Sequence, residues 1–306
     1  MTRAQALRGA RVGFVLATIG FAWWGFAGRW QEIGDALAET GPARLCGAVL
    51  GALAGLALTG VLWRNLLSAV GSRVDLRGAG AVFFVGQLGK YVPGSVWSFA
   101  AQAQLGRRYG VPVRSSVTAS ALFLVLHTFS GLSLGGVLAA GGAIHIDLGR
   151  AWLLLLAGAA TAALAPPVLR FLGDRMSGAE VPMSLTAVDL VRSLALMTGT
   201  WACYGACLWV LVPSASLAPE DVLTAVAAFA LAHAAGVMLV LAPAGLGARE
   251  AVLVALLSPV VGVPAAAAAA LLARAAHTFA DFALAAGAAA SAARTRAREA
   301  AGVRNA

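Results

Sequence analysis

Long apolar stretches recur along the chain at a length that matches the thickness of a membrane. A helix needs about 20 apolar residues to cross about 30 Å of hydrocarbon. Six stretches meet this requirement and predict full transmembrane helices: Val12–Gly28, Ala43–Leu62, Ser115–Ala140, Ala151–Leu169, Ala187–Val212 and Pro264–Ala290. Two further apolar stretches, Ala81–Gly106 and Val222–Gly262, are interrupted by proline and glycine, so each predicts a broken segment rather than one straight helix.

The first stretch has a basic start and therefore allows two interpretations, a retained helix or a cleaved signal peptide. Trp23, Trp24 and Trp30 form an aromatic belt, and no small-residue cleavage site follows the stretch. We expect a retained transmembrane helix.

Composition supports a membrane protein without a soluble domain of significant size. Hydrophobic residues make up 60% of the 306 residues and charged residues only 11%, whereas a soluble domain has about 25% charged residues. The mean hydropathy is +0.84. A surface this apolar requires lipid as its solvent, so the predicted fold class is all-α, a polytopic transmembrane helix bundle.

The net charge of +9 predicts an orientation. Basic residues collect at both chain ends and in alternate loops, while Glu32, Asp35, Glu39 and Asp147 lie in the intervening loops. Cytoplasmic loops are enriched in arginine and lysine. We therefore expect both termini to be cytoplasmic, in an inner or plasma membrane, with the basic face against anionic lipid and no nucleic acid bound.

This assignment requires Ala81–Gly106 to enter and leave on the cytoplasmic side, as a re-entrant hairpin that turns near Pro93 and Gly94. The second broken segment turns at Pro243, Gly245 and Gly247. Six full helices plus two hairpins result. Two full crossings in place of the second hairpin, eight in all, would also keep the C-terminus inside, and the sequence leaves both topologies open.

A repeat links the two broken segments. Pro93 and His127 are 34 residues apart, and Pro243 and His277 have the same spacing 150 residues later. His-Thr-Phe begins at both histidines. The chain is thus one transmembrane domain, 1–306, with repeat 1 at about 80–140, repeat 2 at about 222–290 and a basic cytoplasmic tail at 291–306. Three crossings separate the repeats, which predicts an inverted repeat of the kind found in transporters.

Charged groups inside the last apolar stretch are candidate site residues. Arg274, His277 and Asp281 are spaced i, i+3, i+7 and share one helix face. A charge at the bilayer centre costs at least about 2.5–3.5 kcal/mol, so such groups pair, face inward or line a path. Either an Arg–Asp pair locks helices together, or Arg274 attracts an anionic head group. His127, the repeat mate of His277, has no charged neighbour on its own helix.

Each break is followed by groups suited to an anion. Arg249 and Glu250 lie in the first turn of the helix after the second break, where free backbone N–H groups favour negative charge. Arg249 offers a planar fork for phosphate. Glu250 is a further candidate for the binding site, or else it complements the helix dipole and pairs with Arg249. At the first break, Ser95 is a candidate helix cap, and Lys90 either binds substrate or reaches toward the interface.

No Walker A motif, dinucleotide fingerprint, H-E-x-x-H or C-x-x-C motif is present. We therefore expect no cofactor, no metal and no ATP-driven transport by this chain alone. The short tail after Ala290 leaves no room for a soluble catalytic domain.

The sequences GQLGKYVPGSVW at 86–97 and APAGLGAREAVL at 242–253, with Arg274 downstream, resemble the transmembrane region of the lysylphosphatidylglycerol synthetases, a family also called flippase-like. The resemblance covers about Gly13 to Ala290. In the synthetases this region precedes a cytoplasmic aminoacyl transferase domain and is implicated in moving the modified lipid between leaflets. We expect no such domain in this chain, so aminoacylation is not implied. Stand-alone members are implicated in handling other lipids, including polyprenyl carriers.

The sequence therefore predicts a flippase for a phospholipid or polyprenyl-linked lipid with a polar, anionic head group. Membrane lipids are the expected partners, and a separate lipid synthase or glycosyltransferase is a further candidate. Two other functions stay open: an intramembrane transferase or phosphatase using His277, Asp281 or Glu250, and a non-catalytic partner of a lipid synthase. The oligomeric state does not follow from the sequence.

Overall fold

The computed structural model describes residues 30–92, 96–178, 183–212, 222–238 and 247–304, and helices dominate these ranges, with no strand among them. The predicted first helix, Val12–Gly28, and the predicted turn residues Pro93, Gly94, Ser95, Pro243 and Gly245 lie outside these ranges. The all-α fold class is confirmed.

The predicted straight helices appear with shifted ends. They are α3 (Pro42–Ala69), α6 (Val113–Ala140), α9 (Ala187–Trp209) and α12 (Val263–Arg304). By length and composition, α3, α6 and the part of α12 from Val263 to Thr295 could each cross a membrane. The basic tail predicted at 291–306 continues α12 without a break as far as Arg304.

One predicted straight crossing is bent in the structure, although its two halves together are still long and apolar enough to cross a membrane. Ala151–Leu169 forms two helices, α7 (Arg150–Ala163) and α8 (Pro166–Ser177), bent by 49°. Pro166 and Pro167 begin α8, and proline restricts the residue before it to extended conformations, which ends α7. A short amphipathic helix that the hydrophobic pattern did not predict, α2 (Trp30–Ala38), precedes α3.

Both broken segments have the predicted interruption. The first contains α4 (Leu76–Gln87), the 3₁₀ turn η1 (Leu88–Tyr91) and α5 (Trp97–Gly106), followed by a second 3₁₀ turn, η2 (Arg107–Tyr109). The second contains α10 (Val222–Met238) and α11 (Ala248–Val261). In each segment the two helices pack against one another.

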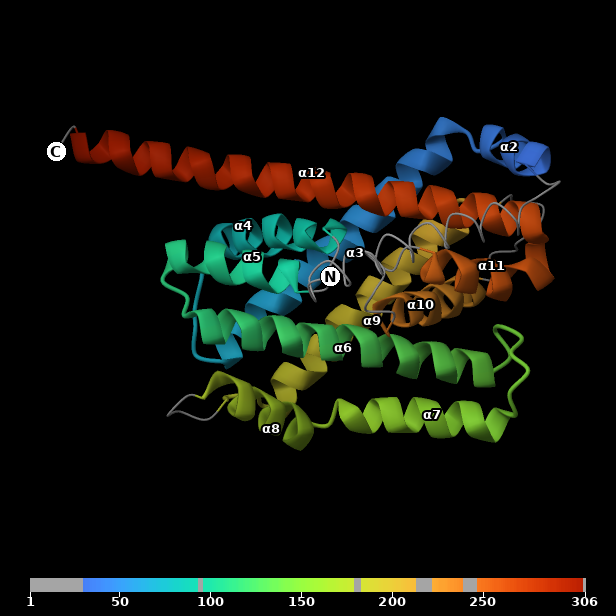
Figure 1. Cartoon of the computed structure of the whole chain (residues 1–306), viewed down its shortest axis with the longest axis horizontal. Coiled ribbons are helices and arrows are strands. Elements are labelled where there is room, and N and C mark those ends of the chain that lie inside the picture. The colour runs from blue at the N-terminus through green and yellow to red at the C-terminus, as the bar shows by residue number, and fades with distance from the viewer. Residues whose placement is uncertain (1–29, 93–95, 179–182, 213–221, 239–246, 305–306) are drawn as a thin grey trace, which may run out of the picture.

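The two segments lie end to end between the long helices α6 and α12 (Figure 1). In the first segment α4 packs on α12 and α5 on α6; in the second, α10 packs on α6 and α11 on α12. α3 and α9 cross behind and pack against each other. The order of one long helix, two short helices and another long helix is therefore present twice, with α7 and α8 between the two copies.

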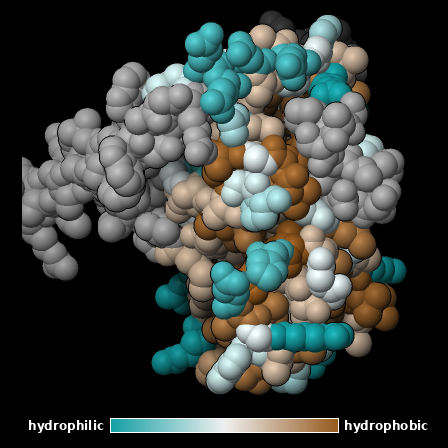
Figure 2. Space-filling model, turned by 90° about the vertical axis from the view of Figure 1, so that its right-hand side faces the viewer, coloured by the Kyte–Doolittle hydropathy of each residue, from teal (hydrophilic) through white to brown (hydrophobic). Residues whose placement is uncertain are grey.

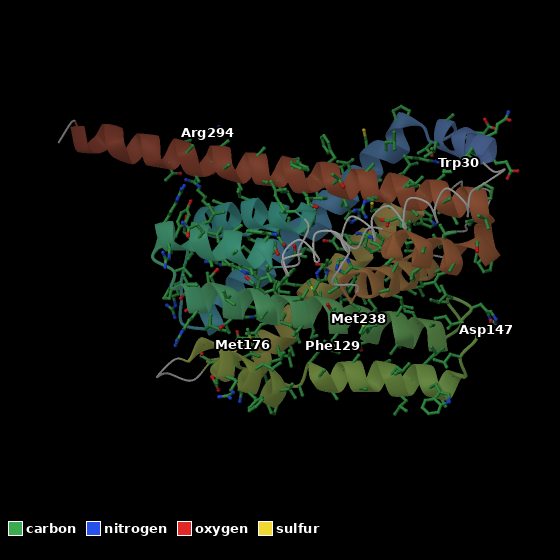
Figure 3. All side chains as sticks on the ribbon, viewed as in Figure 1. Trp30, Phe129, Asp147, Met176, Met238 and Arg294 are labelled. Carbon is green, nitrogen blue, oxygen red and sulfur yellow. The ribbon has the colours of Figure 1, made fainter. Side chains whose placement is uncertain are left out.

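Charge separates along the long axis of the molecule. The turns after α3 and α5, the start of α6 and the helix α8 lie at one end, and α2 and the 141–149 loop lie at the other (Figures 1 and 3). The first end carries Arg73, Arg107, Arg108 and Arg175, and the second carries Glu32, Asp35 and Asp147. Figure 2 views the second end, where hydrophilic and hydrophobic residues are mixed.

Candidate functional site

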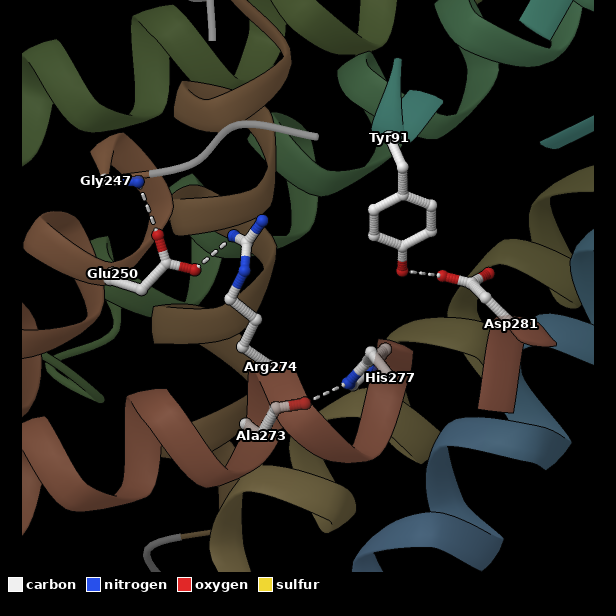
Figure 4. Close-up of polar contacts among 7 residues, drawn as sticks. All are labelled: Tyr91, Gly247, Glu250, Ala273, Arg274, His277 and Asp281. Carbon is white, nitrogen blue, oxygen red and sulfur yellow. Dashed lines mark hydrogen bonds and ion pairs between the residues drawn. The ribbon is translucent and has the colours of Figure 1, made fainter. Parts of the chain in front are cut away.

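The polar face of α12 is the meeting point of the two broken segments. Arg274, His277 and Asp281 lie on this face, as the i, i+3, i+7 spacing predicts (Figure 4). Each of the two charged residues contacts a different segment, and His277 lies between them. One helix face therefore connects two segments that are about 160 residues apart in the sequence, since it binds Lys90 and Tyr91 of the first and Glu250 of the second.

Arg274 holds the start of α11. Its Nη1 lies 2.6 Å from Oε1 of Glu250, and the other carboxylate oxygen, Oε2, accepts the backbone N–H of Gly247 at 2.7 Å. Gly247 has a φ of +86°, a conformation in which a side chain would be strained. The predicted pairing of Glu250 with Arg249 is wrong, because Glu250 caps its own helix and turns toward α12.

Asp281 holds the turn η1 of the first segment. Its Oδ2 lies 2.6 Å from Nζ of Lys90 and accepts the hydroxyl of Tyr91 at 2.7 Å. The Tyr91 ring also stacks on Phe282, with centroids 5.6 Å apart. Asp281 is thus bound to Lys90 rather than to Arg274, so the Arg–Asp pair considered from the sequence does not form. Lys90 reaches toward α12 and remains 31% exposed.

Arg249 differs from Lys90 and Arg274 because it packs on a ring without a carboxylate partner among the described residues. Its guanidinium lies 4.3 Å from the centroid of Phe229, a cation–π contact. Its buried Nη2 has no hydrogen-bond partner among the described residues. A buried guanidinium N–H without an acceptor is costly, so this atom is a candidate donor to a ligand.

A cluster of rings surrounds the histidines. His277 contacts Tyr204 and Phe229 with centroids 4.8 Å and 5.0 Å apart, and its Nδ1–H donates to Ala273 O at 2.8 Å. On the other side of Tyr204, His127 lies 4.9 Å from Trp201 and 4.3 Å from His233, again between centroids. Within the described part of the chain, the buried Nε2 atoms of His127 and His277 have no partner.

The family model that describes the lysylphosphatidylglycerol synthase TM region matches residues 11–285 of the chain. The chain belongs to this family. The match spans every site residue from Lys90 to Asp281 and confirms the resemblance seen in the two motifs. A comparison with curated proteins finds no match.

Membership of this family makes the chain a multi-pass membrane protein tied to lipid metabolism or transport. In this member the site offers hydrogen-bond donors and charged groups, and the described residues contain no group of three or more His, Cys, Asp or Glu side chains that could hold a metal ion. Cys207 Sγ lies 3.9 Å from Nδ1 of His277. Because that nitrogen donates to Ala273 O, it is not free to act as a base for the thiol.

Sequence reasoning found the charged residues but missed their aromatic surroundings. Tyr91, Tyr204, Trp201 and Phe229 bind or pack against the predicted site residues, and His233 belongs with His127. One signal was available: the chain has only three tyrosines, and two of them contact the site.

Proposed function

We propose that this protein moves a lipid with an anionic head group between the two leaflets of an inner or plasma membrane. The head group binds near Arg249, at the junction of the two broken segments, while the hydrocarbon tails stay in lipid. The observation that carries this proposal is the buried Nη2 of Arg249, a cationic donor without an acceptor among the described residues.

Several features support an anion at this position. Gly247 and Arg249 lie at the start of α11, where backbone N–H groups and the helix dipole favour negative charge. Glu250 already uses both carboxylate oxygens on Gly247 and Arg274, so it leaves the Nη2 of Arg249 available to bind a phosphate. A guanidinium binds phosphate oxygens in pairs. Partial exposure of Lys90 (31%) and Arg274 (21%) adds cations that the ligand can reach.

The two copies, α3–α6 and α9–α12, make the same kind of helix contacts with the roles of α6 and α12 interchanged. This arrangement supports a mechanism of alternating access. α4 and α10 occupy corresponding places on α12 and α6, and α6 and α12 run in opposite directions (Figure 1). We propose that the copies act as an inverted repeat. Rocking one copy against the other would expose the site first to one leaflet and then to the other. The basic end of the molecule would face the cytoplasm, with both termini.

Reconstitution in liposomes tests the proposal. The protein is expected to accelerate loss of leaflet asymmetry of a fluorescent phosphatidylglycerol, with no change in the mass of the lipid. Arg249→Ala should reduce the rate at least about tenfold, since a lost charged hydrogen bond corresponds to about 1.5–3 kcal/mol. The exposed Arg192 lies outside the site, so Arg192→Ala serves as the matched control.

Each outcome decides between functions. Normal exchange in Arg249→Ala would remove this residue from the site. A changed lipid mass would favour a transferase or phosphatase. If the lipid is neither exchanged nor chemically changed, a non-catalytic partner of a lipid synthase is favoured.

A further inference from the structure

A groove lies between three helices on the side of the molecule that carries α7. Its volume is about 590 Å³, and its walls come from α6, from the end of α7 with the break before α8, and from α9. α7 and α9 both pack on α6, and the groove separates them. Volumes of about 300–1,000 Å³ are typical of ligand sites.

The lining favours an uncharged, apolar occupant. Its residues are Leu, Val, Ala, Ser, Thr and Trp, without a charged side chain. Three of its hydroxyls are already engaged within the protein: Ser133 and Thr161 bind each other at 2.5 Å, and Ser130 donates to His127 O at 3.2 Å. Thr161 also donates to Ala157 O at 2.8 Å. What the groove offers an occupant is therefore mainly apolar contact.

The surroundings identify the medium that the groove meets. Leu154, Leu155 and Leu156 on α7 are 46–60% exposed, and in a multi-pass membrane protein such a surface lies against acyl chains. The groove continues this surface inward to Trp201, which is 1% exposed. The Trp201 Nε1–H donates to Ser130 Oγ at 3.0 Å, so its indole is fixed in place.

Trp201 also connects the groove to the polar site. It lines the groove and contacts His127 and His233, with centroids 4.9 Å and 5.4 Å apart. We propose that the groove binds one hydrocarbon chain of a membrane lipid, and that Trp201 is the wall between this chain and the head-group site. That the bound chain belongs to the transported lipid rests on the proposed function, whereas the groove as a chain site does not.

Photo-crosslinking in liposomes tests the groove. The probe is phosphatidylglycerol with a diazirine in one acyl chain, competed with unlabelled phosphatidylglycerol, and labelled peptides are mapped by mass spectrometry. We expect saturable labelling of residues 130–137 and 190–201, and non-saturable labelling around the exposed Leu155.

Two alanines on α7 provide a matched pair. Ala162 lines the groove, whereas Ala159, also exposed, does not. Ala162→Phe should lower the saturable labelling about tenfold by filling the groove, and Ala159→Phe should leave it unchanged. Thr198→Phe fills the groove from the α9 wall and should give the same loss, which separates filling of the groove from misfolding of α7.

The outcomes distinguish this inference from the proposed function. Labelling that does not saturate, or that survives both groove-filling variants, would reduce the groove to ordinary contact with surrounding lipid and overturn the inference. Saturable labelling in a protein that fails to exchange lipid would leave the chain site standing and remove the flippase. Lipid exchange without saturable labelling would support the flippase and overturn the groove as a site for a lipid chain.

Discussion

The two broken segments use the same architecture with opposite charge. The first segment presents a cation, Lys90, to an acid on α12, Asp281; the second presents an acid, Glu250, to a cation on α12, Arg274. Both distances are 2.6 Å. The corresponding positions of α6, 150 residues earlier, are Leu124 and Gly131, so only one of the two long helices carries charges at these places.

This difference shows that two segments with similar packing can share one charged helix face. The packing is similar in the two segments. In the first, α4 packs on α12 and α5 on α6, and in the second α11 packs on α12 and α10 on α6. The charges are not shared, and a second set of buried ions would carry its own desolvation cost. Both partners of the segments, the acceptor Asp281 and the donor Arg274, therefore lie on the one helix α12.

The largest expected effect is at the second pair. Arg274→Gln should lower the free energy of unfolding by about 2–4 kcal/mol, because it leaves the Glu250 carboxylate mostly buried with only the Gly247 N–H to bind. Unfolding in mixed micelles, followed by tryptophan fluorescence, measures this loss.

A double-mutant cycle with Glu250→Gln supplies the control for Arg274→Gln. The combined variant should be less destabilised than the sum of the two single variants, since neither charge is then left alone. Additive losses would show that the two side chains do not stabilise each other.

The first pair should be less costly to break. Lys90 is 31% exposed, so part of its charge is already solvated, and Tyr91 also binds Asp281. Lys90→Met should cost about 1–2 kcal/mol in the same unfolding measurement, because an almost buried carboxylate keeps a single donor. Asp281→Asn should cost less than Lys90→Met, since the amide oxygen still accepts the Tyr91 hydroxyl and the remaining charge, on Lys90, is 31% exposed and partly solvated. The reverse order would show that Asp281 is not held mainly by Lys90.

Helical periodicity was sufficient to predict the shared face of α12. The i, i+3, i+7 spacing places Arg274, His277 and Asp281 together regardless of tertiary structure. Proline and glycine likewise located the two breaks. The proline pair at 166–167 carried the same signal for the bend between α7 and α8, but the length of the apolar stretch Ala151–Leu169 outweighed it.

The partners of these groups did not follow from local patterns. Glu250 is next to Arg249 in sequence, yet it binds a residue 24 positions away, because the cap at Gly247 turns the carboxylate toward α12. Tyr91 and Asp281 are 190 positions apart. Aromatic residues such as Trp201 and Phe229 give no sequence signal of their own, since in an apolar helix packing is their usual role.

The smallest stability effects are expected at the repeat-related histidines. Phenylalanine preserves the ring contacts and removes a buried nitrogen that has no acceptor or donor among the described residues. His127→Phe should therefore change the free energy of unfolding by less than about 0.5 kcal/mol, and His277→Phe should cost about 1 kcal/mol through loss of the bond to Ala273 O.

Lipid exchange measured on the same variants sharpens the comparison between the copies. If both Nε2 atoms meet the head group, both variants slow exchange while remaining stably folded, and a loss confined to His277→Phe places the ligand nearer to α12 than to α6. Destabilisation above about 2 kcal/mol in either variant would instead show that the nitrogen is engaged within the folded protein, since a satisfied buried group is costly to remove.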